Sequence, residues 1–226
     1  MTMIADNLHQ VRARIAQACL RVGRDQNDVT LLAVSKTFGP DAVRAAHAAG
    51  QTAFGENYIQ EAVEKIALLA DLPLEWHCIG PMQSNKTRLV ATHFDWAHTV
   101  DRLKIAQRLS EQRPADKPPL NVCIQVNVDG GPTKAGVPPH EALALAQAVA
   151  ALPHLRLRGL MTIPEPAPDF VAACAVHMRA KALFYTLNAA GLGLDTLSMG
   201  MSSDLDAAVA SGSTMVRVGT AIFGGR

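Results

Sequence analysis

The chain has little of several features that would assign it to a specialised class of protein. Its 226 residues include only 4% aromatic residues and four cysteines, and 21 Lys and Arg balance 20 Asp and Glu to a net charge of +1. Because no basic run is present, a nucleic-acid partner is not expected. The cysteines form no CxxC pair, which is typical of buried free thiols in a reducing compartment.

Targeting, membrane and metal signals are also missing. The N-terminus carries Asp6 and no basic region before an apolar core, so it does not read as a secretory signal. The longest apolar run, 142–152, is too short to cross a bilayer. There is no HExxH motif, and no metal site is expected. We therefore expect a cytoplasmic protein with no membrane partner, a monomer or a weak dimer.

Short apolar and β-branched segments recur along the chain and alternate with helical patterns. The expected strands are 30–35, 52–56, 75–80, 94–100, 120–127, 157–163, 195–200 and 215–220. The helical stretches between them are 41–50, 59–70, 101–109, 140–152, 169–191 and 203–212. An additional amphipathic helix opens the chain and ends at Gly23.

Alternation of strands with helices predicts a parallel sheet with right-handed crossovers, and eight such units close into a barrel. An open doubly wound sheet is the alternative, but no GxGxxG turn follows the first strand. The sequence thus predicts an α/β fold: a single (β/α)8 TIM barrel with an extra N-terminal helix, forming one domain over residues 1–226.

Barrel enzymes place their reactive groups at the carboxyl ends of the strands, where this chain carries Lys36 directly after the first strand. Partial burial there would lower the pKa of the amine and favour attack on a carbonyl. The alternative is a lysine that simply extends to water, which is the commoner role of such a residue. Position alone does not decide between the two.

The turns after the last two strands have the composition of a phosphate site. Gly200 and Gly219 allow close approach of backbone N–H groups, and Ser202 and Thr220 add hydroxyls. The alternative is that Ser203 only opens a capping box with a following acid, Asp206. Both arrangements are compatible, because the cap needs neither Ser202 nor Gly219.

Arg217 lies inside the last apolar strand, two residues before the second of these turns. Facing inward it needs a partner, which is either a carboxylate from another strand or a ring nitrogen of a ligand. Among the histidines only His77 deserves notice, and a hydrogen bond to a backbone carbonyl is its expected role.

Six motifs in order, LLAVSKT, FGENYIQE, WHCIGPMQSNK, GLMTI, LSMGMSSD and VRVGTAIFG, resemble the YggS/PROSC family of pyridoxal phosphate homeostasis proteins. The resemblance implies a fold-type-III barrel, similar to the N-terminal domain of alanine racemase, that binds pyridoxal 5′-phosphate (PLP) as a Schiff base. It also implies the contacts: Lys36 on the aldehyde, Ser202, Gly219 and Thr220 on the phosphate with backbone near Met199 and Gly200, Asn57 beside the ring and Arg217 at the ring nitrogen.

Two positions set this chain apart from many members of that family. Phe38 stands where many carry another lysine, and the chain lacks the basic tail that some have. Lys134 does match a family lysine and is a candidate second amine for PLP.

Two classes of function fit these residues. One is a carrier that stores PLP and delivers it to apo PLP-dependent enzymes. The other is a PLP-dependent amino-acid racemase or decarboxylase, which is less expected because the chain shows no second domain after Thr220 and its only tyrosines, Tyr58 and Tyr185, lie in helical stretches. Arg217 opposite the ring nitrogen would also weaken the cofactor as an electron sink. A Schiff-base aldolase acting through Lys36 without PLP is a third alternative.

Overall fold

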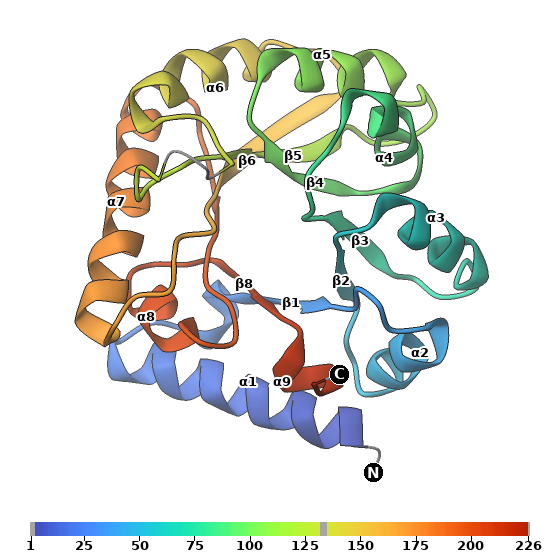
Figure 1. Ribbon diagram of the computed structural model, residues 1–226, viewed down its shortest axis with the longest axis vertical. Coiled ribbons are helices and arrows are strands. Elements are labelled where there is room, and N and C mark those ends of the chain that lie inside the picture. Colours follow the sequence, from blue (N-terminus) through green and yellow to red (C-terminus); the bar gives the residue numbers. More distant parts are fainter. Residues whose placement is uncertain (1–2, 132–134, 226) are drawn as a thin grey trace.

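The computed structural model describes residues 3–131 and 135–225 and contains a closed barrel of eight parallel strands in sequential order, β1 to β8 (Figure 1). This confirms the predicted α/β barrel. The strands are β1 Thr30–Val34, β2 Ala53–Glu56, β3 Glu75–Cys78, β4 Trp96–Val100, β5 Leu120–Gln125, β6 Leu155–Met161, β7 Thr196–Ser198 and β8 Met215–Val218.

Helices surround the barrel on the outside. They are α1 Met3–Arg21, α2 Pro40–Ala48, α3 Ile59–Leu68, α4 Thr87–His93, α5 Leu103–Gln112, α6 Ala142–Ala150, α7 Phe170–Ala189, α8 Leu205–Ala210 and α9 Thr220–Phe223, with 3₁₀ turns at Gln26–Asp28, Ser84–Lys86 and Pro139–Glu141. No helix in the described ranges is long and apolar enough to cross a bilayer. Helices α4 and α9 were not predicted from the sequence, because both are too short to show a clear helical period.

The core has two layers, as the alternation of side chains along strands requires. One layer lies between the strands and the helices, and the other fills the barrel itself. The apolar residues of the inner layer are Leu32, Val34, Ala53, Ile79, Trp96, Cys123, Met161 and Met215. The inner layer also contains buried polar side chains, described below, that connect the two ends of the barrel.

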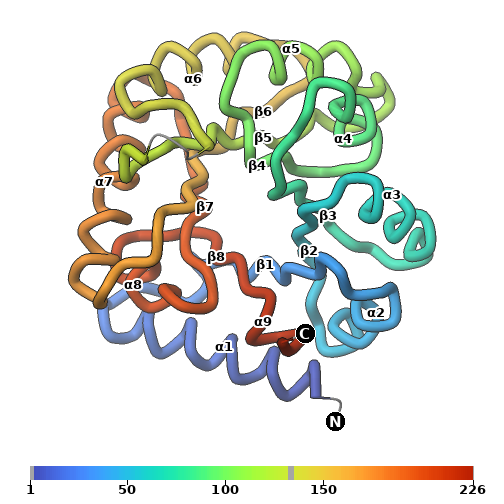
Figure 2. The backbone as a smooth tube through the Cα atoms, in the orientation of Figure 1, coloured from blue at the N-terminus to red at the C-terminus, as the bar shows by residue number. Residues whose placement is uncertain are grey.

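The opening helix α1 runs alongside α8 and α9 (Figure 2). Gly23, at φ +68°, ends it as predicted, with Arg24 N–H donating to Cys19 O. Arg14 pairs with Asp206 and also donates to the carbonyl oxygen of Ser202. Asp206 is therefore engaged by α1 and not in a capping box, and the N-cap of α8 is Asp204 without a side-chain cap bond.

Six predicted strands extend past the observed ends: 30–35, 75–80, 120–127, 157–163, 195–200 and 215–220 end at residues 34, 78, 125, 161, 198 and 218. The reason is that buried apolar residues continue past the last residue that pairs with a neighbouring strand. Ile79 and Met199 follow their strands and are buried, so hydrophobicity does not mark where strand pairing stops. The four cysteines are unpaired as expected, with Cys174 only half-buried.

Candidate functional site

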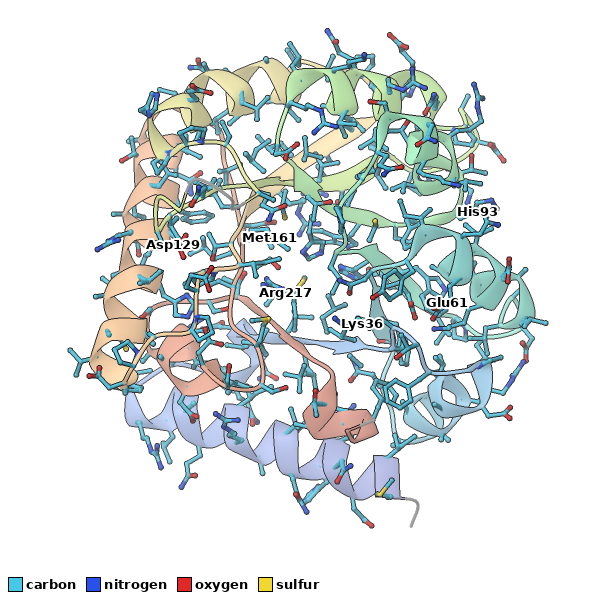
Figure 3. The ribbon with its side chains drawn as sticks, viewed as in Figure 1. Lys36, Glu61, His93, Asp129, Met161 and Arg217 are labelled. Atoms are coloured by element: carbon cyan, nitrogen blue, oxygen red, sulfur yellow. The ribbon has the colours of Figure 1, made fainter. Side chains whose placement is uncertain are left out.

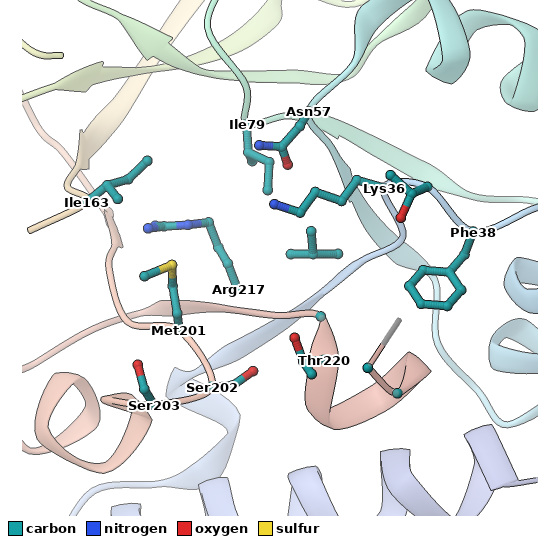
Figure 4. Close-up of a pocket in the computed structure, with 15 residues that line it drawn as sticks. Lys36, Phe38, Asn57, Ile79, Ile163, Met201, Ser202, Ser203, Arg217 and Thr220 are labelled. Atoms are coloured by element: carbon teal, nitrogen blue, oxygen red, sulfur yellow. The ribbon is translucent and has the colours of Figure 1, made fainter. Parts of the chain in front are cut away.

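A cavity of about 430 Å³ opens at the carboxyl ends of the strands, the end where barrel enzymes place their sites (Figure 4). Its described lining contains two cations and no carboxylate. The lining residues are Val34, Lys36, Thr37, Phe38, Asn57, Ile79, Ile163, Met201, Ser202, Ser203, Arg217, Gly219, Thr220, Gly224 and Gly225. Such a lining favours an anionic ligand.

Six of the eight residues proposed from the sequence as cofactor contacts line this cavity: Lys36, Asn57, Ser202, Arg217, Gly219 and Thr220. Met199 and Gly200 do not. Met199 is fully buried in the core layer between strands and helices. Gly200 has φ +98°, and a Cβ there would lie 2.4 Å from Ala208 Cβ, so this glycine allows the turn to pack against α8.

Lys36 projects from the end of β1 into the cavity, with its amine pointing toward the side chain of Arg217 (Figure 4). No described carboxylate forms an ion pair with it. Phe38 lines the cavity but has no amine to offer, and its ring stacks on that of Phe223 with centroids 5.1 Å apart. Lys134 lies outside the described residues.

Arg217 enters from β8 and is only 4% exposed. Its Nη1 donates to Ser198 Oγ and its Nη2 to Thr162 O, each at 2.8 Å. Within the described ranges it pairs with no carboxylate, so the buried ion pair considered from the sequence is not found. Burial lowers the pKa of Arg217 to about 10, which leaves it a cation at neutral pH.

Behind Arg217 a row of polar side chains crosses the barrel interior. His98 Nδ1 lies 2.8 Å from Ser198 Oγ, and His98 Nε2 lies 2.8 Å from His77 Nδ1. His77 Nε2 lies 2.7 Å from Glu75 Oε1 at the opposite end of the barrel. The expectation of a backbone carbonyl partner for His77 was wrong. Burial lowers the pKa of both histidines, so both are neutral at physiological pH.

Backbone amides supply anion donors at one side of the cavity. Among the described residues, the N–H groups of Ser202, Ser203, Gly219 and Thr220 donate to no other protein group. They come from the turns after β7 and β8, and the hydroxyls of Ser202, Ser203 and Thr220 lie at the same wall (Figure 4). Free amides and hydroxyls at one wall can bind the oxygens of a phosphate.

Asn57 lies at the end of β2 on another side of the cavity. Its Oδ1 is buried and has no hydrogen-bond partner in the described structure, which is costly unless a ligand group donates to it. The backbone beside it is tightly packed. A Cβ at Gly80 would lie 2.1 Å from Asn57 O, so only glycine fits there.

The apolar walls of the cavity were not predicted from the sequence. Ile79 directly follows β3, Met201 directly follows the predicted strand 195–200, and Ile163 is the last residue of the predicted strand 157–163. In Figure 4, Ile79 lies near the Lys36 amine, and Ile163 and Met201 lie beside the Arg217 guanidinium. Their position after a strand was the available signal, but apolar side chains at strand ends are usually core residues.

Comparison with known proteins agrees with this geometry. The family model for the alanine racemase N-terminal domain matches residues 6–226. A Pseudomonas aeruginosa protein named pyridoxal phosphate homeostasis protein is 62% identical over 226 residues, covering 100% of this chain and 97% of the relative. The protein of the same name from Escherichia coli K12 is 55% identical over 229 residues, covering 100% and 98%.

Among solved structures, PipY of Synechococcus elongatus with PLP bound superposes with a TM-score of 0.86 at 39% identity, covering 98% of this chain and 100% of PipY. Each of these three alignments covers nearly all of this chain and nearly all of the relative. The chain therefore belongs to the alanine racemase N-terminal domain family and, within it, to the pyridoxal phosphate homeostasis proteins.

Proposed function

We propose that this protein binds PLP through a Schiff base on Lys36 and serves in PLP homeostasis as a store and donor of the cofactor. One observation supports the proposal above all: a single cavity without described carboxylates joins a primary amine, unpartnered backbone amides and a buried guanidinium. The amine condenses with the aldehyde to a C=N bond and releases water, which needs no further reagent.

The residues present fit the chemical groups of PLP. The amides and hydroxyls of Ser202, Gly219 and Thr220 would hold the phosphate, and Arg217 would face the ring nitrogen. Asn57 offers its buried, unpartnered Oδ1 beside the ring. We further propose that the backbone near Met199 and Gly200 contributes to phosphate binding indirectly, because these two residues shape the turn after β7.

A carrier fits the lining better than a racemase or decarboxylase does. Apart from Lys36 and Arg217, the described lining contains no side chain that commonly moves a proton, because no His, Asp, Glu, Tyr or Cys reaches it. A guanidinium is too weak an acid to protonate a ring nitrogen at neutral pH, so the bound cofactor would stabilise carbanions poorly. The names of the two relatives, homeostasis proteins, agree with this assignment.

The recipients we propose are apo PLP-dependent enzymes, and the proposed compartment is the cytoplasm. Four unpaired cysteines, of which three are buried, support a reducing compartment. Transfer of PLP then requires only hydrolysis of the C=N bond, which restores the Lys36 amine and the free aldehyde.

The proposal is tested by borohydride reduction of the PLP-loaded protein followed by peptide mapping. We expect the pyridoxyl group on Lys36, and we expect Lys36→Ala to lose the visible absorbance that a PLP Schiff base gives. Lys134→Ala is the matched control and should keep both. Label found mainly on Lys134, or visible absorbance that survives in Lys36→Ala, would contradict the assignment.

A further inference from the structure

A buried charged cluster lies next to the turn that carries Lys36, outside the cavity. It consists of Glu56 at the end of β2 and Glu61 and Lys65 on α3, and we call it the clamp. Lys65 Nζ lies 2.7 Å from Glu56 Oε1 and 3.2 Å from Glu61 Oε1. The side chains of Glu56 and Lys65 are 0% and 4% exposed, and that of Glu61 is 38% exposed.

The clamp holds the residue before Lys36 through two hydrogen bonds. Lys65 Nζ donates to the carbonyl oxygen of Ser35 at 2.9 Å. Ser35 Oγ in turn donates to Glu56 Oε1 at 2.6 Å. Both the backbone and the side chain of Ser35 are therefore fixed by buried charged partners, which form stronger hydrogen bonds than neutral groups do.

The clamp also holds the residue after Lys36. The backbone N–H of Thr37 donates to Glu61 Oε1 at 2.8 Å. Thr37 has φ +68°, a left-handed conformation that is strained for a β-branched residue and persists only when its surroundings impose it. Figure 3 shows Glu61 on the α3 side of the strand end from which Lys36 points inward.

Burying the charged groups of Glu56 and Lys65 is expensive, and an apolar cluster of the same volume is often equally stable. What the charged set adds is directional hydrogen bonding to the backbone on both sides of one side chain. We propose that the clamp is a positioning device: Glu61 keeps Thr37 left-handed, Lys65 fixes Ser35, and together they aim the Lys36 amine into the cavity. This inference rests on the proposed role of Lys36 as the PLP amine.

Glu61 is the member to test, because it is partly exposed and its variants should fold. We expect Glu61→Ala to weaken formation of the Lys36–PLP linkage about tenfold, measured as the equilibrium constant from visible absorbance. Glu61→Gln keeps an oxygen acceptor for the Thr37 N–H and should stay within about threefold of the unaltered protein. Equal losses in the two variants would overturn the proposal, since charge and not the hydrogen bond would then matter.

A glycine at position 37 provides a rescue test. Glycine adopts positive φ without strain, so the Thr37→Gly protein should need Glu61 less. In that background we expect Glu61→Ala to weaken the linkage by less than about threefold, against about tenfold in the unaltered background. An identical loss in both backgrounds would show that Glu61 does not act through Thr37.

A readout without PLP separates this inference from the proposed function. In the protein prepared free of PLP, Glu61→Ala should speed hydrogen exchange of the Thr37 amide at least about tenfold. If the unaltered protein never links PLP to Lys36, the proposed function fails while amide exchange still reports on the clamp. Unchanged exchange in Glu61→Ala would overturn the clamp even where Lys36 binds PLP.

Discussion

At the scale of single residues, Arg217 shows that the folded structure identifies hydrogen-bond partners that the sequence pattern leaves open. An arginine between two valines in an apolar strand must face the barrel interior or the helices, and the sequence left its partner open between a carboxylate and a ligand. In the described structure it has a hydroxyl and a carbonyl as partners and no carboxylate. The guanidinium is therefore a buried cation whose charge faces the cavity.

We expect Arg217→Ala to leave a folded protein with altered PLP binding. Because no ion pair is broken, the free energy of unfolding without PLP should fall by less than the roughly 3–5 kcal/mol that an orphaned buried partner costs. The PLP absorbance maximum should shift or the affinity should fall. Arg217→Lys, which keeps the charge without the planar fork, is the control.

Urea unfolding and absorbance titration measure the two quantities separately. A loss of stability of about 3–5 kcal/mol with an unchanged PLP spectrum would assign Arg217 a structural role. The reverse result, a stable protein with a shifted spectrum, is the one that the geometry supports.

At the scale of elements, the row of polar side chains from β3, β4 and β7 has only one consistent arrangement of hydrogens. Arg217 can only donate, so Ser198 Oγ accepts from it and gives its own hydrogen to His98 Nδ1. His98 then donates from Nε2 to His77, whose Nε2–H points to Glu75. The hydrogen bond from His77 lowers the pKa of Glu75, which keeps that end an ionised acceptor.

Through His98, this row of polar side chains makes the free energy of unfolding depend on pH. Burial first, then repulsion from His77 whenever that ring is protonated and from the Arg217 cation, lower the pKa of His98 well below its ordinary value. Below the unfolded pKa of about 6.5, the unfolded chain binds a proton that the folded chain excludes. The contribution of neutral His98 is therefore complete above that pH and is lost as pH falls, by up to about 1.4 kcal/mol per pH unit.

We expect His98→Gln to remove this dependence. Between about pH 7.5 and pH 5.5, the difference in unfolding free energy between the unaltered protein and the variant should shrink by about 1 kcal/mol. Urea unfolding of both proteins at the two pH values measures it. A difference that does not change with pH would mean that His98 is protonated or solvated in the folded state.

At the scale of the whole molecule, the cavity opens at the end of a single barrel. Apart from Lys36 and Arg217, its described lining contains no His, Asp, Glu, Tyr or Cys side chain that could act as an acid or a base. Controlled carbanion chemistry needs positioned acid–base groups and exclusion of water. Storage and release need only reversible formation of the C=N bond. The described lining supplies the groups that the proposed carrier needs.

We therefore expect the PLP-loaded protein to pass its cofactor to an apo PLP-dependent enzyme and to leave amino acids unchanged. Recovery of the recipient's activity, with free PLP as the reference, measures the transfer. Chiral analysis of alanine incubated with the loaded protein measures turnover. Racemisation with kcat of about 1 s⁻¹ or more would identify an enzyme.

The sequence by itself determined the barrel, because eight apolar segments alternating with amphipathic ones have few other solutions. It also placed Lys36 and the two glycine turns at one end, since parallel strands share a carboxyl edge. Strand ends and short helices such as α4 were not predictable, because buried apolar loops carry the same signal as strands.

Only the tertiary structure decided which polar groups meet. The partners of Arg217, the row from Ser198 to Glu75, and the clamp around Lys36 all join residues from different strands and helices. Local patterns report which face of an element is buried, but hydrogen-bond partners depend on the register and stagger of the closed barrel. Those contacts between distant segments form the site, and they exist only in the folded chain.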